Sequence, residues 1–96
     1  MTTSADYLQK MKALHGEFKR FKVREIGLFG SVVRGEQKES SDLDVLVDFA
    51  DDADLFDLVG LGLFLEENLG RKVDVVPRRA LRKELREQVL KDVVAV

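Results

Sequence analysis

Three aspartates have the type and spacing of a site for a hard cation. Asp42 and Asp44 are two residues apart in an alternating segment, so both side chains leave the same face of a strand. Two carboxylates at such a short separation repel each other unless a cation lies between them. Asp74 stands alone in an apolar run, where an unpartnered carboxylate is costly. If its strand lies beside that of Asp44, we expect a three-carboxylate catalytic site for one or two Mg²⁺ ions.

A glycine and a serine upstream of these carboxylates have the pattern of a phosphate-binding turn. Gly30 and Ser31 stand between an expected strand and an expected short helix. A glycine there permits a tight turn and lets a phosphate approach the backbone. The N-terminus of the following helix offers N–H groups to an anion, and the Ser31 hydroxyl adds a donor. The pair therefore predicts a triphosphate cradle, as phosphoryl-type transfer requires.

The hydrophobic pattern predicts the elements that hold these groups. Strands are expected over 23–29, 42–49 and 72–76, and short helical or loop segments over 31–35 and 36–41. The middle strand has a core face of Leu43, Val45, Val47 and Phe49. Three longer helices are also expected. The first is capped by Thr3 or Ser4, and its inward residues are Leu8, Met11, Leu14 and Phe18. The second ends at Gly70 with Leu55, Leu58, Val59, Leu65 and Leu69 inward, and the third covers 80–92 with Leu81, Leu85, Val89 and Val93 inward. The order predicts an α/β (α+β) fold, a small mixed sheet of three to four strands with helices packed on it, in one domain over 1–96.

Composition excludes several classes of function. The chain has 45% hydrophobic and 35% charged residues and a net charge of −2, so bulk nucleic-acid binding is not expected. It has no cysteine and one histidine, which leaves oxygen ligands for any metal. Neither a signal peptide nor an apolar run long enough to cross a membrane is visible, so we expect a cytoplasmic protein without membrane contact.

At these residues the sequence resembles a known family. Gly30-Ser31, ten residues and then Asp42-Leu43-Asp44 resemble the signature of the polymerase-β-type nucleotidyltransferase superfamily. The wider run LFGSVVRGEQKESSDLDVLVDF is similar to the minimal nucleotidyltransferase (MNT) branch. The resemblance implies a nucleotidyltransferase fold in which Asp42, Asp44 and Asp74 bind Mg²⁺ and Gly30 and Ser31 contact the phosphates. It also implies an antitoxin that transfers AMP from ATP to a tyrosine hydroxyl of a partner HEPN-domain ribonuclease toxin, in a hetero-oligomer with that toxin.

Several alternatives remain open at this point. The domain is too short to include an acceptor-binding helical domain, which favours an acceptor on another protein over RNA or a small molecule. A non-catalytic antitoxin that acts by complex formation alone is a second hypothesis. Arg34 is either a phosphate or partner contact or an ion-pair partner of Glu36. The tail over 93–96 either pairs as a strand or docks on a partner. The basic residues between 71 and 83 either keep the protein soluble or contact nucleotide, RNA or an acidic partner: Arg71, Lys72, Arg78, Arg79, Arg82 and Lys83.

Overall fold

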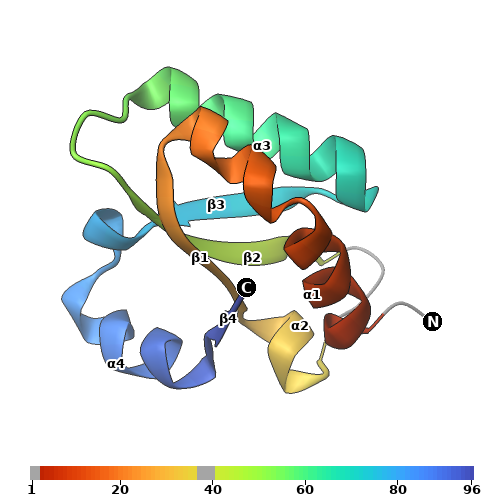
Figure 1. Cartoon of the computed structure of the whole chain (residues 1–96). Helices are drawn as coiled ribbons and strands as arrows, with labels where there is room; N and C mark the ends of the chain where they lie inside the picture. The colour runs from red at the N-terminus through yellow and green to blue at the C-terminus, as the bar shows by residue number, and fades with distance from the viewer. Residues whose placement is uncertain (1–2, 37–40) are drawn as a thin grey trace.

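A computed structural model describes residues 3–36 and 41–96 (Figure 1). Most of the loop expected over 36–41 therefore lies outside the described residues. The elements follow in this order: α1 Ser4–Ala13, η1 His15–Phe21, β1 Val23–Phe29, α2 Ser31–Arg34, β2 Leu43–Phe49, α3 Leu55–Leu69, β3 Val73–Pro77, η2 Arg78–Ala80, α4 Lys83–Asp92 and β4 Val94–Ala95. The three predicted strands and the short helix after Gly30 are confirmed. No described helix is long and apolar enough to cross a bilayer.

The four strands form one mixed sheet in the order β3-β2-β1-β4. β1 pairs antiparallel with both β2 and β4, and β2 pairs parallel with β3. For the tail over 93–96, the two alternatives were pairing as a strand or docking on a partner. Part of it pairs as β4, along the outer edge of β1. The expected mixed sheet with helices packed on it is confirmed.

Helices cover both faces of the sheet, and β2 buries apolar side chains on both. The predicted core face of β2 is buried, and it packs with residues of α1, η1 and α3. On the opposite face, which also carries the carboxylates, Leu46 is buried against Leu81 and Val89. Figure 1 shows α4 on the side of the sheet away from α3. The carboxylates thus lie at one end of a face whose middle is covered by α4.

The first predicted stripe is divided between two helices. Thr3 caps α1 in a capping box with Asp6, and α1 ends at Ala13. The chain continues as the 3₁₀ segment η1, which buries Phe18. Leu8 and Leu14 are only partly buried. The break is invisible in the hydrophobic pattern because both segments contribute to the same core.

The inward faces predicted for the two later helices are partly wrong. In α3, Leu61, Leu65 and Leu69 are buried, whereas Leu55 and Val59 are 70% and 50% exposed. Since α3 is apolar on two faces, periodicity did not decide which of them meets the sheet. The last helix begins at Lys83 rather than near residue 80, after η2. Its Leu85 is exposed, because only Val89 of that helix reaches the cluster around Leu46.

The pairing of β4 depends on a close backbone approach at Gly27. A Cβ atom at Gly27 would lie 2.7 Å from Val93 Cγ2 and 2.8 Å from the carbonyl oxygen of Val94. We expect Gly27→Ala to lower the free energy of unfolding by about 1–3 kcal/mol, because such overpacking forces a backbone shift. Urea denaturation measures the change. Gly16→Ala, whose Cβ would meet nothing within 4 Å, is the control; equal stability of the two variants would contradict the prediction.

Candidate functional site

Strand register brings two of the three predicted carboxylates side by side. Asp44 of β2 is opposite Asp74 of β3, and on its other side it is opposite Phe29, the last residue of β1. Asp42 lies just before β2. Asp44 is half-buried, while Asp42 and Asp74 are exposed. The strand pairing that the site required is therefore present, and the three residues lie at one end of the sheet.

The turn at Gly30 packs directly against the Asp44 carboxylate. Gly30 has φ 80° and ψ −151°, a conformation that is nearly restricted to glycine. A Cβ atom at this position would lie 2.2 Å from Asp44 Oδ2. Ser31 then begins α2, whose single turn is held by N–H groups of Val33 and Arg34 bonded to the Gly30 carbonyl. Because α2 has only four residues, its dipole is small, and the glycine turn itself is what brings backbone to the carboxylates.

The electrostatics of Asp44 fit a cation in this place. Burial raises the pKa of Asp44, and the nearby charges of Asp74 and then Asp42 raise it further, while Arg34 opposes them. Within residues 3–36 and 41–96, no three carboxylate, imidazole or thiol groups already surround a common point. Asp42 and Asp74 are exposed, however, so their side chains can turn without repacking the core. An all-oxygen donor set with unrelieved repulsion fits Mg²⁺.

Arg34 is engaged by two carboxylates. Its Nε donates to Glu36 at 3.1 Å and its Nη1 donates to Asp92 at 3.0 Å. The expected ion pair with Glu36 is confirmed, and the bond to Asp92 ties α2 to the last turn of α4. The alternative role, in phosphate or partner binding, would require Arg34 to exchange one of these partners.

Arg71 belongs to the site in a way that the sequence did not reveal. It was grouped with the basic surface residues, but it is partly buried and donates to the carbonyl oxygen of Ser41 and, at 3.4 Å, to the hydroxyl of Tyr7. The next backbone anchor is Leu43, whose N–H donates to the Lys72 carbonyl at 2.9 Å. Asp42 is thus held between two anchors on the segment that links α3 to β3. The only feature of the sequence that could have indicated this role is the position of Arg71 directly after Gly70, the glycine that ends α3.

We expect Arg71→Met to loosen this segment, because the substitution keeps the aliphatic stem and removes every donor. The free energy of unfolding should fall by about 1.5–3 kcal/mol, as for hydrogen bonds to a charged group, and the Leu43 amide should exchange faster with solvent. Hydrogen exchange read by NMR measures both effects. Lys72→Met, at an exposed neighbour, is the control, and unchanged exchange at Leu43 in Arg71→Met would refute the anchoring role.

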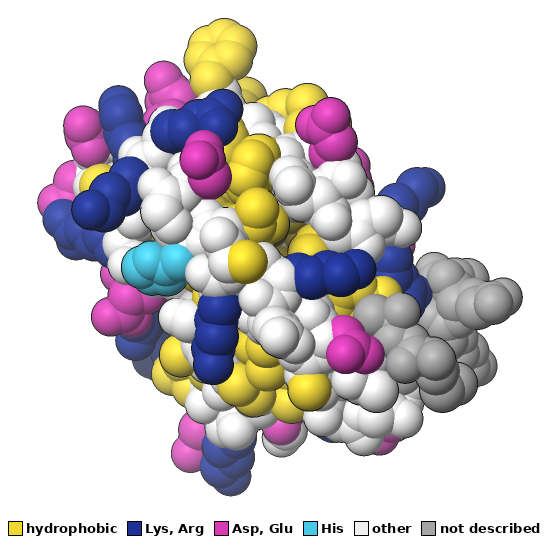
Figure 2. All heavy atoms as spheres, turned by 45° about the vertical axis from the view of Figure 1, so that its right-hand side comes forward, with side chains coloured by type: hydrophobic (Ala, Val, Ile, Leu, Met, Phe, Trp, Pro, Cys, Tyr) yellow, Lys and Arg dark blue, Asp and Glu magenta, His cyan; other side chains and the backbone are white. Residues whose placement is uncertain are grey.

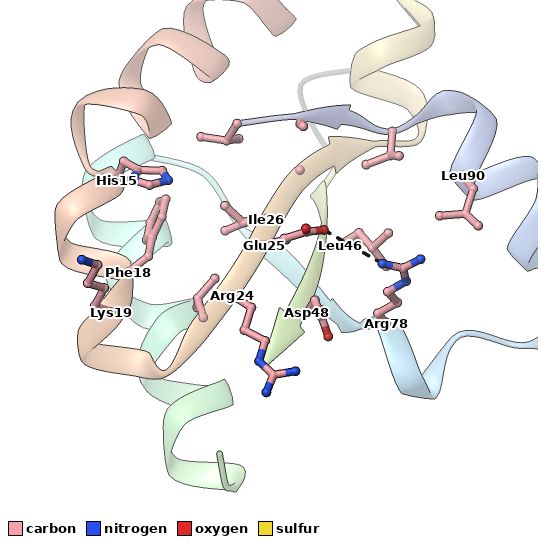
Figure 3. Close-up of a pocket in the computed structure, with 15 residues that line it drawn as sticks. His15, Phe18, Lys19, Arg24, Glu25, Ile26, Leu46, Asp48, Arg78 and Leu90 are labelled. Atoms are coloured by element: carbon pink, nitrogen blue, oxygen red, sulfur yellow. Dashed lines mark ion pairs between the residues drawn. The ribbon is translucent and has the colours of Figure 1, made fainter. Parts of the chain in front are cut away.

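Two of the predicted basic residues pair with carboxylates other than Asp42, Asp44 and Asp74. Arg79 pairs with Asp51 at 3.3 Å and Arg78 with Glu25 at 4.0 Å, both at exposed positions. Figure 3 shows Glu25 and Arg78 pointing toward each other at the rim of a hollow of about 450 Å³. This hollow follows β1 between η1 and α4, and none of the predicted site residues lines it. On the face drawn in Figure 2, cationic and anionic side chains are interspersed.

Comparison with known proteins places this geometry in a family. The model of the nucleotidyltransferase domain family matches residues 11–96. The protein adenylyltransferase MntA of Thermococcus cleftensis is 49% identical over 77 residues, which are 80% of this chain and 78% of that protein. A solved structure assigned provisionally to the minimal nucleotidyltransferases superposes with a TM-score of 0.86 at 38% identity, covering 99% of this chain and 97% of its own. A toxin–antitoxin crystal structure with AMP-PNP superposes with a TM-score of 0.72 at 30% identity, over 91% of this chain and 69% of that one.

The match to the family model includes every element that positions the carboxylates and the Gly30 turn, from β1 to β3. The chain belongs to the nucleotidyltransferase domain family and is a nucleotidyltransferase of its minimal branch.

Proposed function

We propose that this protein is an antitoxin that transfers AMP from ATP to a tyrosine hydroxyl of a partner HEPN-domain toxin. The observation that carries the proposal is the packing of the Asp44 carboxylate over the Gly30 turn, with Asp74 beside it in register. It puts the proposed cation ligands and the proposed phosphate contacts in one place. Similarity to an adenylyltransferase and to a toxin–antitoxin structure with AMP-PNP supports the donor and the class of partner.

Each residue has a distinct role in this proposal. Asp42, Asp44 and Asp74 hold one or two Mg²⁺ ions, which neutralise the phosphates of ATP when bound. Gly30 lets the triphosphate approach the backbone, and Ser31 donates to it. Asp74 is exposed, so an attacking hydroxyl can reach it, and in our proposal Asp74 also accepts the proton of that hydroxyl.

Arg34 contributes positive charge beside the turn. Its side chain is 42% exposed and lies on α2, directly after Gly30 and Ser31. In our proposal it exchanges Glu36 for a phosphate or a partner group when the substrates bind. Since ATP is the donor, we place the reaction in the cytoplasm. Similarity to a toxin–antitoxin structure supports a hetero-oligomer with the toxin.

A toxin-neutralisation experiment separates catalysis from complex formation alone. A HEPN-domain toxin is co-expressed with the wild-type protein or with Asp42→Ala, and growth and the intact mass of the toxin are measured. We expect growth and added AMP mass with the wild-type protein, and neither with the variant at equal expression. Full rescue by Asp42→Ala without added mass would overturn the proposal and favour an antitoxin that only binds.

A further inference from the structure

The two carboxylates that bind Arg34 differ in how firmly they are fixed. Glu36 accepts from Nε at 3.1 Å and Asp92 accepts from Nη1 at 3.0 Å. The Glu36 side chain is 64% exposed, whereas the Asp92 side chain is 17% exposed. Gln88 donates to both oxygens of Asp92 at 3.3 Å. Asp92 is therefore a fixed partner of Arg34, whereas Glu36 can turn away into solvent.

The backbone on both sides of Asp92 is also held in place. Asp92 ends α4, and Val89, one turn before it, is buried. After it, Val94 pairs with Leu28 of β1, two residues before Gly30. The end of α4 thereby lies beside α2, as Figure 1 shows. The sheet itself thus brings the Asp92 carboxylate to the Gly30 turn.

Helix stability does not explain a carboxylate at the end of α4. The C-terminus of a helix carries a partial negative charge, which disfavours Asp92 and favours a cation. Among residues 3–36 and 41–96, Arg34 is the only cation that pairs with Asp92. Arg34 in turn lies on α2, which has only four residues. Asp92 therefore gives a long side chain on a very short helix a defined direction.

One edge of the Arg34 guanidinium remains suited to an anion. Within residues 3–36 and 41–96, Nη2 has no hydrogen-bond partner. Nε and Nη2 form an edge that can donate to two oxygens of a phosphate at once, and Glu36 uses only Nε. Burial raises the pKa of Asp44, and the charge of Arg34 opposes this rise. The guanidinium thus lies within electrostatic reach of the carboxylate site.

From this geometry we infer that Asp92 is a positioning residue for the nucleotide. It holds Arg34 through Nη1 while the Nε–Nη2 edge binds the triphosphate, and Glu36 occupies part of that edge until the phosphates displace it. An arginine side chain that is already ordered loses less conformational entropy when a phosphate binds. The inference rests on the proposed function for the identity of the anion as the triphosphate of ATP.

Calorimetry with Mg²⁺ and AMP-PNP, without the toxin, tests the inference separately from the transfer reaction. Asp92→Ala and Glu36→Ala each remove one carboxylate from the same guanidinium, so they change the net charge equally. We expect Asp92→Ala to weaken the Kd by roughly 3- to 10-fold, the effect of having to order one free arginine side chain. Glu36→Ala should tighten the Kd by about 2- to 5-fold, since the exposed pair that competes with the phosphates is weak.

Three controls separate positioning from general effects of charge. Glu87→Ala, at an exposed position of α4, should bind AMP-PNP normally. In an Arg34→Met chain, Asp92→Ala should have no further effect, because its role passes through Arg34. Inorganic tripolyphosphate should give the same pattern as AMP-PNP, since the contact is with the phosphates.

Opposite shifts in Asp92→Ala and Glu36→Ala support the inference, even if no AMP reaches the toxin. Unchanged or tighter binding by Asp92→Ala, with circular dichroism showing an intact fold, overturns it even if AMP is transferred. A loss of affinity in Asp92→Ala that persists in the Arg34→Met chain also overturns it. If Asp92→Ala does not fold, Gln88→Ala, which releases the Asp92 carboxylate, replaces it and should weaken binding. No binding of AMP-PNP by the wild-type chain overturns the inference together with the proposed donor.

Discussion

Replacing Asp44 by asparagine is expected to lower the rate of AMP transfer by roughly 10³-fold. Asp44 is the carboxylate that contacts the Gly30 turn and lies beside Asp74. Losing its charge removes several kcal/mol of cation and phosphate stabilisation, and each 1.36 kcal/mol corresponds to about tenfold in rate. A quenched-flow or gel assay with labelled ATP, saturating Mg²⁺ and the toxin measures the loss. Asp48→Asn, on the same strand and face but beyond Leu46, is the control.

Asp44→Asn lowers activity, but it should raise the stability of the fold when no metal is present. Burial and the charges of Asp74 and Asp42 raise the pKa of Asp44 in the folded state, so the native protein binds more protons than the unfolded chain between the two pKa values. Stability therefore falls as pH rises through that window and stays lower above it. Asp44→Asn should raise the Tm by a few degrees at pH 7 in EDTA, since about 1 kcal/mol shifts Tm by 4–8 °C in a domain of this size.

Loss of activity together with higher stability in EDTA would identify Asp44 as a metal ligand. Below the ordinary pKa range of aspartate, the wild-type protein and Asp44→Asn should have equal stability. At pH 7, Mg²⁺ should raise the Tm of the wild-type protein by ligand binding and leave that of the variant unchanged. A variant that is less stable than the wild-type protein in EDTA at pH 7 would show that Asp44 is structural instead.

Gly30→Ala is expected to have an effect of comparable size on activity. The new methyl group would lie 2.2 Å from Asp44 Oδ2, and the backbone at φ 80° and ψ −151° disfavours any side chain. Either the carboxylate or the turn must move. A displacement of about 1 Å in a catalytic constellation costs on the order of 10²-fold in rate. Steady-state transfer kinetics measure the loss, and circular dichroism shows whether the fold is kept.

Gly35 provides a matched control for the backbone part of this effect. It also has a positive φ, of 73°, but a Cβ atom there would meet nothing within 4 Å. Gly35→Ala should therefore lose about 1–2 kcal/mol of stability from the left-handed conformation alone and keep most of its activity. If both variants lost activity equally, the contact between Gly30 and Asp44 would not be the cause.

Local features of the site were predictable from the sequence. The alternation along β2 placed Asp44 correctly on the face opposite Leu43 and Val45, because side-chain direction in a strand depends only on position parity. Asp42, predicted as the first residue of that strand, lies just before it. Gly30 was recognisable as a turn between a strand and a helix. The functional roles of Asp42, Asp44, Asp74, Gly30, Ser31 and Arg34 stay predictions until they are measured, whereas the positions of these residues in the structure are now known.

Features that depend on tertiary packing were not predictable. The pairing of Asp74 with Asp44 is set by strand order, on which a single sequence carries only a weak signal. The anchor from Arg71 to Ser41 joins residues thirty positions apart, and nothing in the local pattern specified it. The inward faces of α3 and α4 were partly wrong at Leu55 and Leu85, because apolar residues there exceed what the sheet can cover.

Transfer of label from ATP to the toxin tests the central claim most directly. The wild-type protein is incubated with Mg²⁺, the toxin and ATP labelled either at the α-phosphate or at the γ-phosphate. Transfer of AMP predicts that the α-label becomes attached to a toxin tyrosine, that the γ-label leaves with pyrophosphate, and that EDTA abolishes both. Attachment of the γ-label, or attachment of the α-label that Asp42→Ala/Asp44→Ala does not diminish, would contradict the account.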